Sequence, residues 1–367
     1  MVRLAGKKRA DGTIGRRELV RCLAAGTVGL LTACGPSGTA VTANGTGPVT
    51  PRRGAARKPF GGPIELHSWF DLPDDPRSRE LSGIAWDEAT GTLWAVQDES
   101  ANIVPIVPDH DLRTWGFGPV IALKTSFPLD LEGIAIVPDG FIIASEKGPR
   151  VLEVDRQGKL RRDIPLPAHY AKARDNKSLE SLSLSPDGHY LFTTTEEALT
   201  CDGAKATPTT GTRVRVLRMT RDGGEATEHA YMTDPLPHDS GDYGIADLAA
   251  LSNDDLLVLE RGWTRGSGNT VRIYRVSLAD PTTSCLKAAE LAADAPVMAK
   301  SLVVDLAKVS AKGLPETRQK QTAPLLDNFE GLAVGPVLPD GRRSLVLVTD
   351  DNGRTDQFAR IVVLAVG

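Results

Sequence analysis

Leu131-Glu132-Gly133-Ile134-Ala135-Ile136-Val137-Pro138-Asp139-Gly140-Phe141-Ile142-Ile143-Ala144-Ser145-Glu146 is the stretch that decides the fold. It reads as an apolar strand, a Pro-Asp-Gly turn and a second apolar strand that ends on a carboxylate. Related hairpins recur four more times, and each opens and closes on an acid. The other copies run from Glu80 to Asp98, from Glu180 to Glu196, from Asp247 to Glu260 and from Glu330 to Asp350.

The spacing of these hairpins indicates a repeat architecture. The opening acids stand 52, 48, 67 and 83 residues apart along the chain. A four-stranded propeller blade needs roughly 40–50 residues, and the first two intervals fit that length. The sequence therefore predicts an all-β fold, a β-propeller of five or six four-stranded blades. A degenerate sixth blade would occupy residues 296–328, where 301–306 reads as a lone strand.

The two ends of the folded part are both strand-like. Residues 64–70 alternate in polarity before the first hairpin, and residues 361–365 form an apolar run at the far end. Closed propellers avoid a free sheet edge when their termini pair. We therefore expect the termini to share one blade.

The N-terminal segment carries export signals. Arg16-Arg17 precedes an apolar run of about a dozen residues, which is typical of a twin-arginine signal and too short to span a bilayer. Leu31-Thr32-Ala33-Cys34 resembles a lipobox, in which the cysteine is acylated. The sequence predicts a lipoprotein signal over residues 1–34 with lipidation at Cys34, and the alternative is an ordinary signal peptide with a chance cysteine.

A polar tether follows the signal. Residues 35–61 are rich in Gly, Thr, Pro and Arg and have almost no large apolar side chain, so they cannot bury enough surface to fold. We interpret them as a disordered linker that holds a propeller domain, residues 62–367, outside the cytoplasm. The lipid anchor is the only membrane contact that we expect.

Charge excludes one class of partner. Removing the seven basic and two acidic residues of segment 1–33 leaves 36 basic and 45 acidic residues, a net charge of −9. Nucleic-acid-binding proteins present basic surfaces, so we expect no nucleic-acid partner. An acidic domain suits a cation site. We expect a monomer that acts on a small molecule.

Two cysteines remain in the propeller. Cys201 and Cys285 lie in polar stretches outside the repeated strands. Outside the cytoplasm such a pair most often forms a disulfide, and the alternative is two free thiols. The cysteine spacing does not fit a zinc site.

The repeated acids are candidate ligands for a divalent cation. In a propeller the innermost strands line a central channel, so equivalent residues of successive blades form a ring. Crowded carboxylates in a low dielectric require cations, and an oxygen-only cluster favours Ca²⁺ or Mg²⁺. The alternative is that each acid caps its own blade by accepting backbone N–H groups. The predicted metal residues are Glu80, Glu132, Glu180, Asp247 and Glu330.

The sequence resembles the phytase-like propellers of bacteria, a family described by the esterase-like activity of phytase. The resembling segments are spread over nearly the whole propeller and are 80–85, 130–135, 176–182, 260–262 and 328–333. The resemblance implies hydrolysis of phosphoric or carboxylic esters in an acidic, Ca²⁺-dependent channel. Because a fold does not fix a function, it leaves the substrate open.

Cations next to the acids suit a phosphoester. We predict a metal-bound water as nucleophile, with Glu146, Glu196 or Glu260 as its base and Arg261 sharing the phosphoryl group. Lys147, Lys177 and Arg354 are the predicted substrate-binding residues. The sequence has no G-x-S-x-G and no HExxH motif, which disfavours a serine hydrolase and a zincin. The alternative function is a non-catalytic cell-surface propeller with a structural acidic ring.

Overall fold

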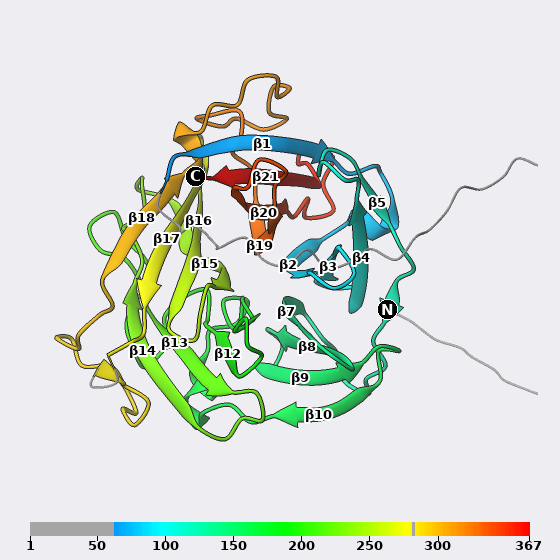
Figure 1. Cartoon of the computed structure of the whole chain (residues 1–367). Helices are drawn as coiled ribbons and strands as arrows, with labels where there is room; N and C mark the ends of the chain where they lie inside the picture. Colours follow the sequence, from blue (N-terminus) through cyan, green and yellow to red (C-terminus); the bar gives the residue numbers. More distant parts are fainter. Residues whose placement is uncertain (1–61, 281–282) are drawn as a thin grey trace, which may run out of the picture. The chain divides into compact units, whose positions relative to one another are not determined.

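The computed structural model describes residues 62–280 and 283–367, which form a five-bladed β-propeller (Figure 1). Five antiparallel sheets surround a central channel, and the first strand of blades 1 to 4 is the innermost. The predicted signal, with Cys34, and the linker over 35–61 lie outside the described residues. The all-β propeller prediction is confirmed.

Each blade is a meander of four strands. Blade 1 contains β2 (Leu81–Asp87), β3 (Thr92–Gln97), β4 (Asn102–Pro108) and β5 (Trp115–Phe117), and the short β6 (Ile121–Ala122) also pairs with β4. Blade 2 contains β7 (Leu131–Val137), β8 (Gly140–Ser145), β9 (Arg150–Asp155) and β10 (Leu160–Ile164). Blade 3 contains β11 (Ser183–Leu184), β12 (Tyr190–Thr193), β13 (Arg213–Thr220) and β14 (Ala226–Met232). Blade 4 contains β15 (Gly241–Ala250), β16 (Asp255–Thr264), β17 (Gly268–Ser277) and β18 (Lys300–Asp305).

The fifth blade joins the two ends of the described chain. It contains β19 (Phe329–Val337), β20 (Arg343–Thr349), β21 (Arg360–Val366) and, as its outer strand, β1 (Ile64–Asp71). The pairing of β1 with β21 runs from Ile64 opposite Val366 to Asp71 opposite Arg360. This closure, visible in blue and red in Figure 1, confirms the expected shared blade.

The region predicted to hide a sixth blade belongs to blade 4. Residues 300–305 form β18, which pairs with β17 as the outer strand, so they are not a lone strand. In the described chain, residues 306–328 contain only the 3₁₀ turn η4 (Leu306–Lys308). The apolar residues of that segment, such as Leu325 and Leu326, pack into the core between blades 4 and 5.

The glycines of the repeated motif permit the inner strands to approach one another. A Cβ added to Gly133 would lie 2.5 Å from the backbone nitrogen of Leu182 in blade 3, and one added to Gly83 would lie 2.3 Å from the carbonyl oxygen of Glu132. Real Cβ atoms do not come this close to backbone. These two glycines are therefore a packing requirement of adjacent blades, and the apolar residues beside them fill the space between the sheets.

Register irregularities mark the channel ends of the inner strands. In blade 2 the pairing passes from Leu131 directly to Gly133, and in blade 5 it passes from Phe329 to Gly331. Glu132 and Glu330 are therefore the extra residues of β-bulges. Because a bulge re-aims a side chain, it turns these two carboxylates out of the normal strand alternation.

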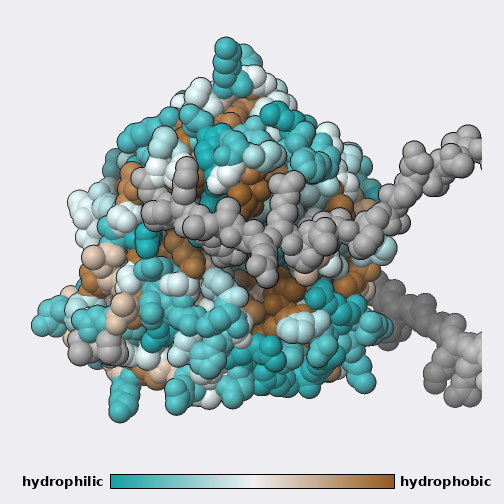
Figure 2. Space-filling view, viewed as in Figure 1, coloured by the Kyte–Doolittle hydropathy of each residue, from teal (hydrophilic) through white to brown (hydrophobic). Residues whose placement is uncertain are grey.

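The opposite ends of the inner strands surround a second cavity of ≈ 480 Å³, lined by residues such as Ile84, Ile134, Leu184 and Val334. Figure 2 shows one face of the molecule, with hydrophilic residues dominating its edge and hydrophobic ones exposed nearer its middle. No helix among the described residues is long and apolar enough to cross a bilayer.

Candidate functional site

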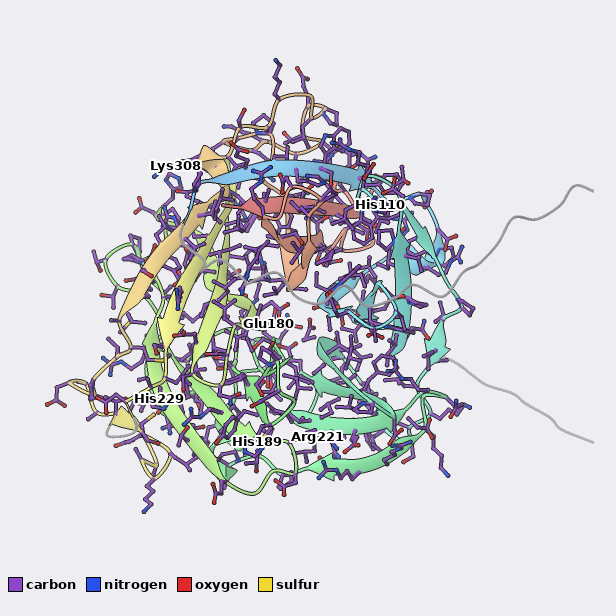
Figure 3. All side chains as sticks on the ribbon, in the orientation of Figure 1. His110, Glu180, His189, Arg221, His229 and Lys308 are labelled. Carbon is purple, nitrogen blue, oxygen red and sulfur yellow. The ribbon has the colours of Figure 1, made fainter. Side chains whose placement is uncertain are left out.

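A polar cavity of ≈ 600 Å³ occupies the channel at the start of the inner strands. Nine carboxylates line it, against three cationic side chains, so it attracts cations. The carboxylates belong to Asp98, Glu99, Asp130, Glu132, Glu146, Glu180, Glu196, Glu330 and Asp350, and the cations to Lys177, Arg261 and Arg354. In Figure 3 Glu180 lies near the axis, whereas the labelled histidines lie in the outer parts of the blades.

Equivalent residues of four blades are identified by a shared hydrogen bond. In each of these blades, the backbone N–H of the acid at the end of the second strand donates to a carbonyl at the start of the first strand. The residue two positions after that carbonyl is the one that faces the channel, and we call it the ring position. These bonds are Asp98 to Glu80, Glu146 to Asp130, Glu196 to Ser178 and Asp350 to Asn328. The ring positions are therefore Ser82, Glu132, Glu180 and Glu330, all of which line the cavity.

Glu80 is therefore not the ring residue of blade 1. It is equivalent to Asp130, and its place in the ring is taken by Ser82, whose hydroxyl donates to Glu132 Oε2 at 2.6 Å. Glu80 is absent from the residues that line the cavity, and its backbone N–H donates to Asp351 Oδ1 at 3.1 Å. The sequence pattern assigns the ring position of blade 1 to Glu80, two residues before Ser82, because Glu80 is the acid nearest to the start of the hairpin.

Asp247 is buried but does not reach the cavity. In blade 4 the register shift skips Ala246, so Asp247 remains paired opposite Leu259. Its carboxylate accepts the N–H of Leu248 at 2.8 Å and the N–H of Leu332 in blade 5 at 2.7 Å. Here the structure matches the capping alternative, because the acid links two neighbouring blades.

Blade 4 contributes a cation to the ring instead. Arg261 Nη2 lies 2.8 Å and 2.9 Å from the two oxygens of Glu330, and 3.8 Å from Glu180 and Glu196. Burial lowers the pKa of Arg261, but the charges of Glu330, Glu196 and Glu180 outweigh it and hold the pKa above its ordinary value. Arg261 therefore stays charged and neutralises part of the acid cluster.

Glu260 lies on the other side of β16 because successive strand residues point to opposite faces. Its carboxylate accepts hydrogen bonds from Tyr231, from the Asp234 backbone at 3.0 Å and from Lys300 Nζ at 2.6 Å. It does not line the cavity. Of the three predicted bases, Glu260 is thus the one that the structure separates from the site.

Three carboxylates converge closely enough to hold a metal ion. One oxygen each from Asp98, Asp130 and Glu132 lies within 4.8 Å of the others. Asp98 Oδ1 is buried and has no hydrogen-bond partner in residues 62–280 and 283–367. Burial, followed by the nearby Asp130 carboxylate, raises the pKa of Asp98 to about 9. Burial, and then the charge of Asp98, raises the pKa of Glu132.

The other predicted polar residues divide into two groups. Glu146 and Glu196 both line the cavity; Glu146 Oε1 accepts the Ser178 N–H at 2.7 Å, and Lys177 Nζ donates to Glu196 at 2.7 Å. Burial raises the pKa of Glu146 to about 7. Lys147 does not line the cavity but pairs with Asp130 at 3.3 Å.

Arg354 lies at the mouth of the cavity, because it lines the wall while its side chain is 59% exposed. It forms a fork-like pair with Asp356, at 2.8 Å for both bonds. Exposed ion pairs of this kind contribute at most about 1 kcal/mol, so the bond to Asp356 holds Arg354 only weakly.

Cys201 and Cys285 are both free thiols in the structure, which does not contain the predicted disulfide. They lie on loops that reach one buried cluster: Cys201 adjoins Asp202, and the Cys285 carbonyl lies 3.5 Å from Arg215 Nη1. Arg215 pairs with Asp202 at 2.6 Å. The disulfide stays a prediction that thiol titration can test.

Sequence reasoning overlooked several residues of the site. Asp130 was visible as an acid two positions before Glu132, a spacing that places both at one strand end. Ser82 was hidden because it is not acidic. Trp263 and Asn269 line the cavity from blade 4, and the alternation Arg261-Gly262-Trp263 was the available signal for the first of them.

The fold and site define a five-bladed propeller with an acidic channel cavity. The chain belongs to the phytase-like family, described as having the esterase-like activity of phytase, which matches residues 76–353. No curated protein matches the chain.

Several solved structures are similar at low identity. A Lactobacillus plantarum protein shares 15% identity with a TM-score of 0.35, covering 74% of this chain and 64% of its own. Kuenenia stuttgartiensis hydrazine synthase shares 12% identity with a TM-score of 0.35, covering 85% of this chain and 65% of its own. Myxococcus xanthus glutaminyl cyclase shares 11% identity with a TM-score of 0.40, covering 83% and 99%. The chain thus spans less than two thirds of the length of the first two.

Proposed function

We propose that this propeller hydrolyses phosphoric esters of small molecules and that its activity depends on a divalent cation. The observation that carries the proposal is the convergence of Asp98, Asp130 and Glu132 in the same cavity as Lys177 and Arg261. The donors are all oxygens, which suits Ca²⁺ or Mg²⁺. The unpartnered Asp98 Oδ1 fits a role as a ligand, since a buried carboxylate oxygen without a partner is costly.

When bound, such a cation supplies Lewis acidity towards an ester oxygen and lowers the pKa of water. The protein supplies charge for the rest of the substrate. Lys177 and Arg354 present N–H donors to the cavity, where they would hold the non-bridging oxygens of a phosphoryl group. Arg261, paired with Glu330, offsets part of the negative charge of the cavity wall.

Glu146 is the best candidate for the general base. It lines the cavity and, within the described chain, forms no ion pair of 4.0 Å or less, whereas Glu196 is engaged with Lys177. Its Oε1 atom is fixed by the Ser178 N–H, which leaves Oε2 to accept a proton from water. Replacing Glu146 with Gln removes this acceptor at nearly constant shape, and we expect turnover to fall about 100-fold or more.

The experiment compares chelated and reloaded protein. The chain is treated with EDTA and assayed with p-nitrophenyl phosphate and p-nitrophenyl acetate, before and after addition of Ca²⁺ or Mg²⁺. We expect phosphate ester turnover that requires the cation and is lost in Asp98→Asn. The control is Asp139→Asn, an exposed acid at the far turn of β7 and β8.

Two results would contradict this function. Cation binding without turnover of either ester would favour the alternative, a non-catalytic binding propeller. In such a protein the acids would serve the fold, as Asp247 does by accepting the N–H groups of Leu248 and Leu332. Turnover that EDTA does not affect would exclude the cation from the reaction.

We also propose that the propeller acts outside the cytoplasm as a lipid-anchored monomer. The support is the sequence alone: the paired Arg16-Arg17 and the lipobox that ends at Cys34. Labelling of cells with radioactive palmitate should mark the wild-type chain and not Cys34→Ala. Unlabelled wild type would contradict the anchor, and light scattering of the soluble domain tests the monomer.

A further inference from the structure

The second cavity, of ≈ 480 Å³, lies at the end of the channel away from the acidic cluster. All five blades contribute apolar side chains to it from near the far end of their inner strands, namely Ile84, Ile136, Leu184, Leu251 and Val334. Val337, which also lines this cavity, is 53% exposed. Apolar side chains that gather at an open hollow mark a surface on which another group packs.

The N-terminal segment enters the propeller at this same end. The strand register of blade 5 places four residues in one row, from the outer to the inner strand: Ile64, Val366, Arg343 and Val337. The last two of them line the second cavity. In Figure 1 the start of β1 lies beside the C-terminus. The residues before Ile64 therefore leave the propeller at the end where the second cavity opens.

Phe60 is within reach of the second cavity. Neighbouring strands lie about 4.8 Å apart, so three spacings, about 14 Å, separate β1 from β19. The four residues from Phe60 to Ile64 span at most about 14 Å when extended. Phe60 is also the only aromatic residue between Cys34 and Ile64. It is therefore the linker residue with the most apolar surface to bury.

Charge favours the same occupant. The segment 35–63 contains no acid, and Arg57-Lys58 comes shortly before Phe60. Glu88 lines the second cavity from the turn between β2 and β3 of blade 1, which packs against blade 5. Its Oε2 atom accepts the indole N–H of Trp86 at 3.0 Å, and within the described chain it forms no ion pair of 4.0 Å or less. A basic side chain of the segment would supply a partner for this exposed carboxylate.

We propose that residues 57–60 dock into the second cavity of their own propeller. Phe60 packs between the apolar ends of blades 5 and 1, and Arg57 or Lys58 pairs with Glu88. The docked segment closes the channel at the end remote from the acidic cluster and fixes the point from which the rest of the linker leaves. This docking is independent of the proposed hydrolysis, because it involves the other end of the channel.

The direct test is photo-cross-linking in the full chain. The photoreactive amino acid p-benzoylphenylalanine is placed at position 60, the protein is irradiated, and mass spectrometry locates the linked residue. We expect an intramolecular link to the wall of the second cavity, at residues such as Val334 and Val337. The matched control carries the same amino acid at position 49, outside the docked segment, and should not form this link.

Melting curves measure what the docked segment contributes. Phe60→Ala should lower the melting temperature by roughly 2–6 °C, because a partly buried aromatic side chain is lost, whereas Val49→Ala should melt as wild type. Phe60→Ala combined with Val337→Ala should lose less than the sum of the two single losses, since the two side chains touch. Arg57→Gln with Lys58→Gln should lower the melting temperature by a smaller amount at low salt, and Arg52→Gln with Arg53→Gln should not.

Several results would overturn the docking. The first is the absence of a link from position 60 to the cavity wall, or an equal link from position 49. The second is a melting temperature of Phe60→Ala equal to that of wild type. A covalent dimer linked from position 60 would assign the cavity to a second copy of the chain. If p-benzoylphenylalanine at position 337 labelled lipid in phosphatidylglycerol vesicles and not residues 57–60, the apolar end would be a membrane contact instead.

Discussion

Replacing Arg261 with glutamine removes the cation that lies between Glu330, Glu180 and Glu196. The guanidinium contacts both Glu330 oxygens, at 2.8 Å and 2.9 Å, and its side chain is 12% exposed. Glutamine retains hydrogen-bonding capacity but no charge. The three carboxylates then repel one another in a buried site, with Lys177 as the remaining nearby cation on the wall.

The size of the effect follows from burial. Removing one partner of a buried ion pair costs about 3–5 kcal/mol, because the other partner is left as an uncompensated charge. For a domain of this size about 1 kcal/mol corresponds to roughly 2–4 °C in melting temperature, so Arg261→Gln should melt roughly 6–20 °C below wild type. Urea unfolding at neutral pH in EDTA measures the free energy directly.

A double-mutant cycle with Glu330→Gln isolates the pair. Glu330→Gln removes the negative charge that Arg261→Gln leaves without a partner. The double variant should therefore be more stable than the sum of the two single losses of stability predicts. Arg150→Gln is the matched control: Arg150 and Asp163 form an exposed pair, which contributes at most about 1 kcal/mol. A loss below about 1 kcal/mol in Arg261→Gln, or strict additivity with Glu330→Gln, would refute the assigned role of Arg261.

Three further predictions concern packing, titration and thiols. Gly133→Ala should destabilise the fold by about 1–3 kcal/mol in urea unfolding. The control is Gly116→Ala, which should have no such effect because the added methyl group meets nothing within 4 Å. Equal losses of stability in the two variants would contradict the tight contact between blades. Burial, followed by the charge of Glu330, raises the pKa of Asp350 from 3.8 to about 8. The folded state therefore holds this proton longer than the unfolded state, and stability falls as pH rises from about 4 to about 8. Asp350→Asn should reduce that fall in melting curves recorded in EDTA; an unchanged pH profile would argue against it. Burial raises the pKa of the Cys285 thiol to about 11, so Cys285 should react with Ellman's reagent far more slowly in native protein than in urea. Equal rates would contradict this, and a thiol count in urea that does not fall when Cys201 and Cys285 are both replaced by Ser would indicate the disulfide.

The architecture was predictable because its signals are local. An apolar hairpin with a Pro-Asp-Gly turn recurs along the chain, and strand-like ends require a partner, so a closed propeller followed from the sequence. The blade count did not follow, because the outer strand of blade 4 is separated from β17 by a long loop that has no period of its own. Residues 296–328 were expected to hold a further blade because the interval between Asp247 and Glu330 exceeds the length of one blade, but residues 306–328 pack as a loop.

The site was predictable only in part because its geometry depends on single-residue shifts. Bulges turn Glu132 and Glu330 towards the channel, and the shift at Ala246 keeps Asp247 out of it. Sequence periodicity does not reveal where a bulge falls. The same limit explains why Glu80 was chosen in place of Ser82.

Blade 4 shows the remaining difficulty. Glu260 and Arg261 are adjacent in sequence, and an acid at the end of the second strand is the rule in the other blades. Here β16 continues to Thr264, and Arg261 rather than Glu260 faces the cavity. Whether an acid is a ligand, a cap or part of a separate network depends on which face of the strand its side chain lies on. Only the folded chain reveals that face.

The central claim is that the channel cavity holds a divalent cation at Asp98, Asp130 and Glu132. Isothermal titration of the EDTA-treated, dialysed chain with Ca²⁺ tests it most directly. Wild type should bind Ca²⁺ with proton release, because the raised pKa of Asp98 leaves that carboxyl protonated at neutral pH and cation binding displaces its proton. Asp98→Asn should bind far more weakly, and Asp139→Asn should bind as wild type. Absence of heat with both Ca²⁺ and Mg²⁺, or equal binding by Asp98→Asn, would contradict the account.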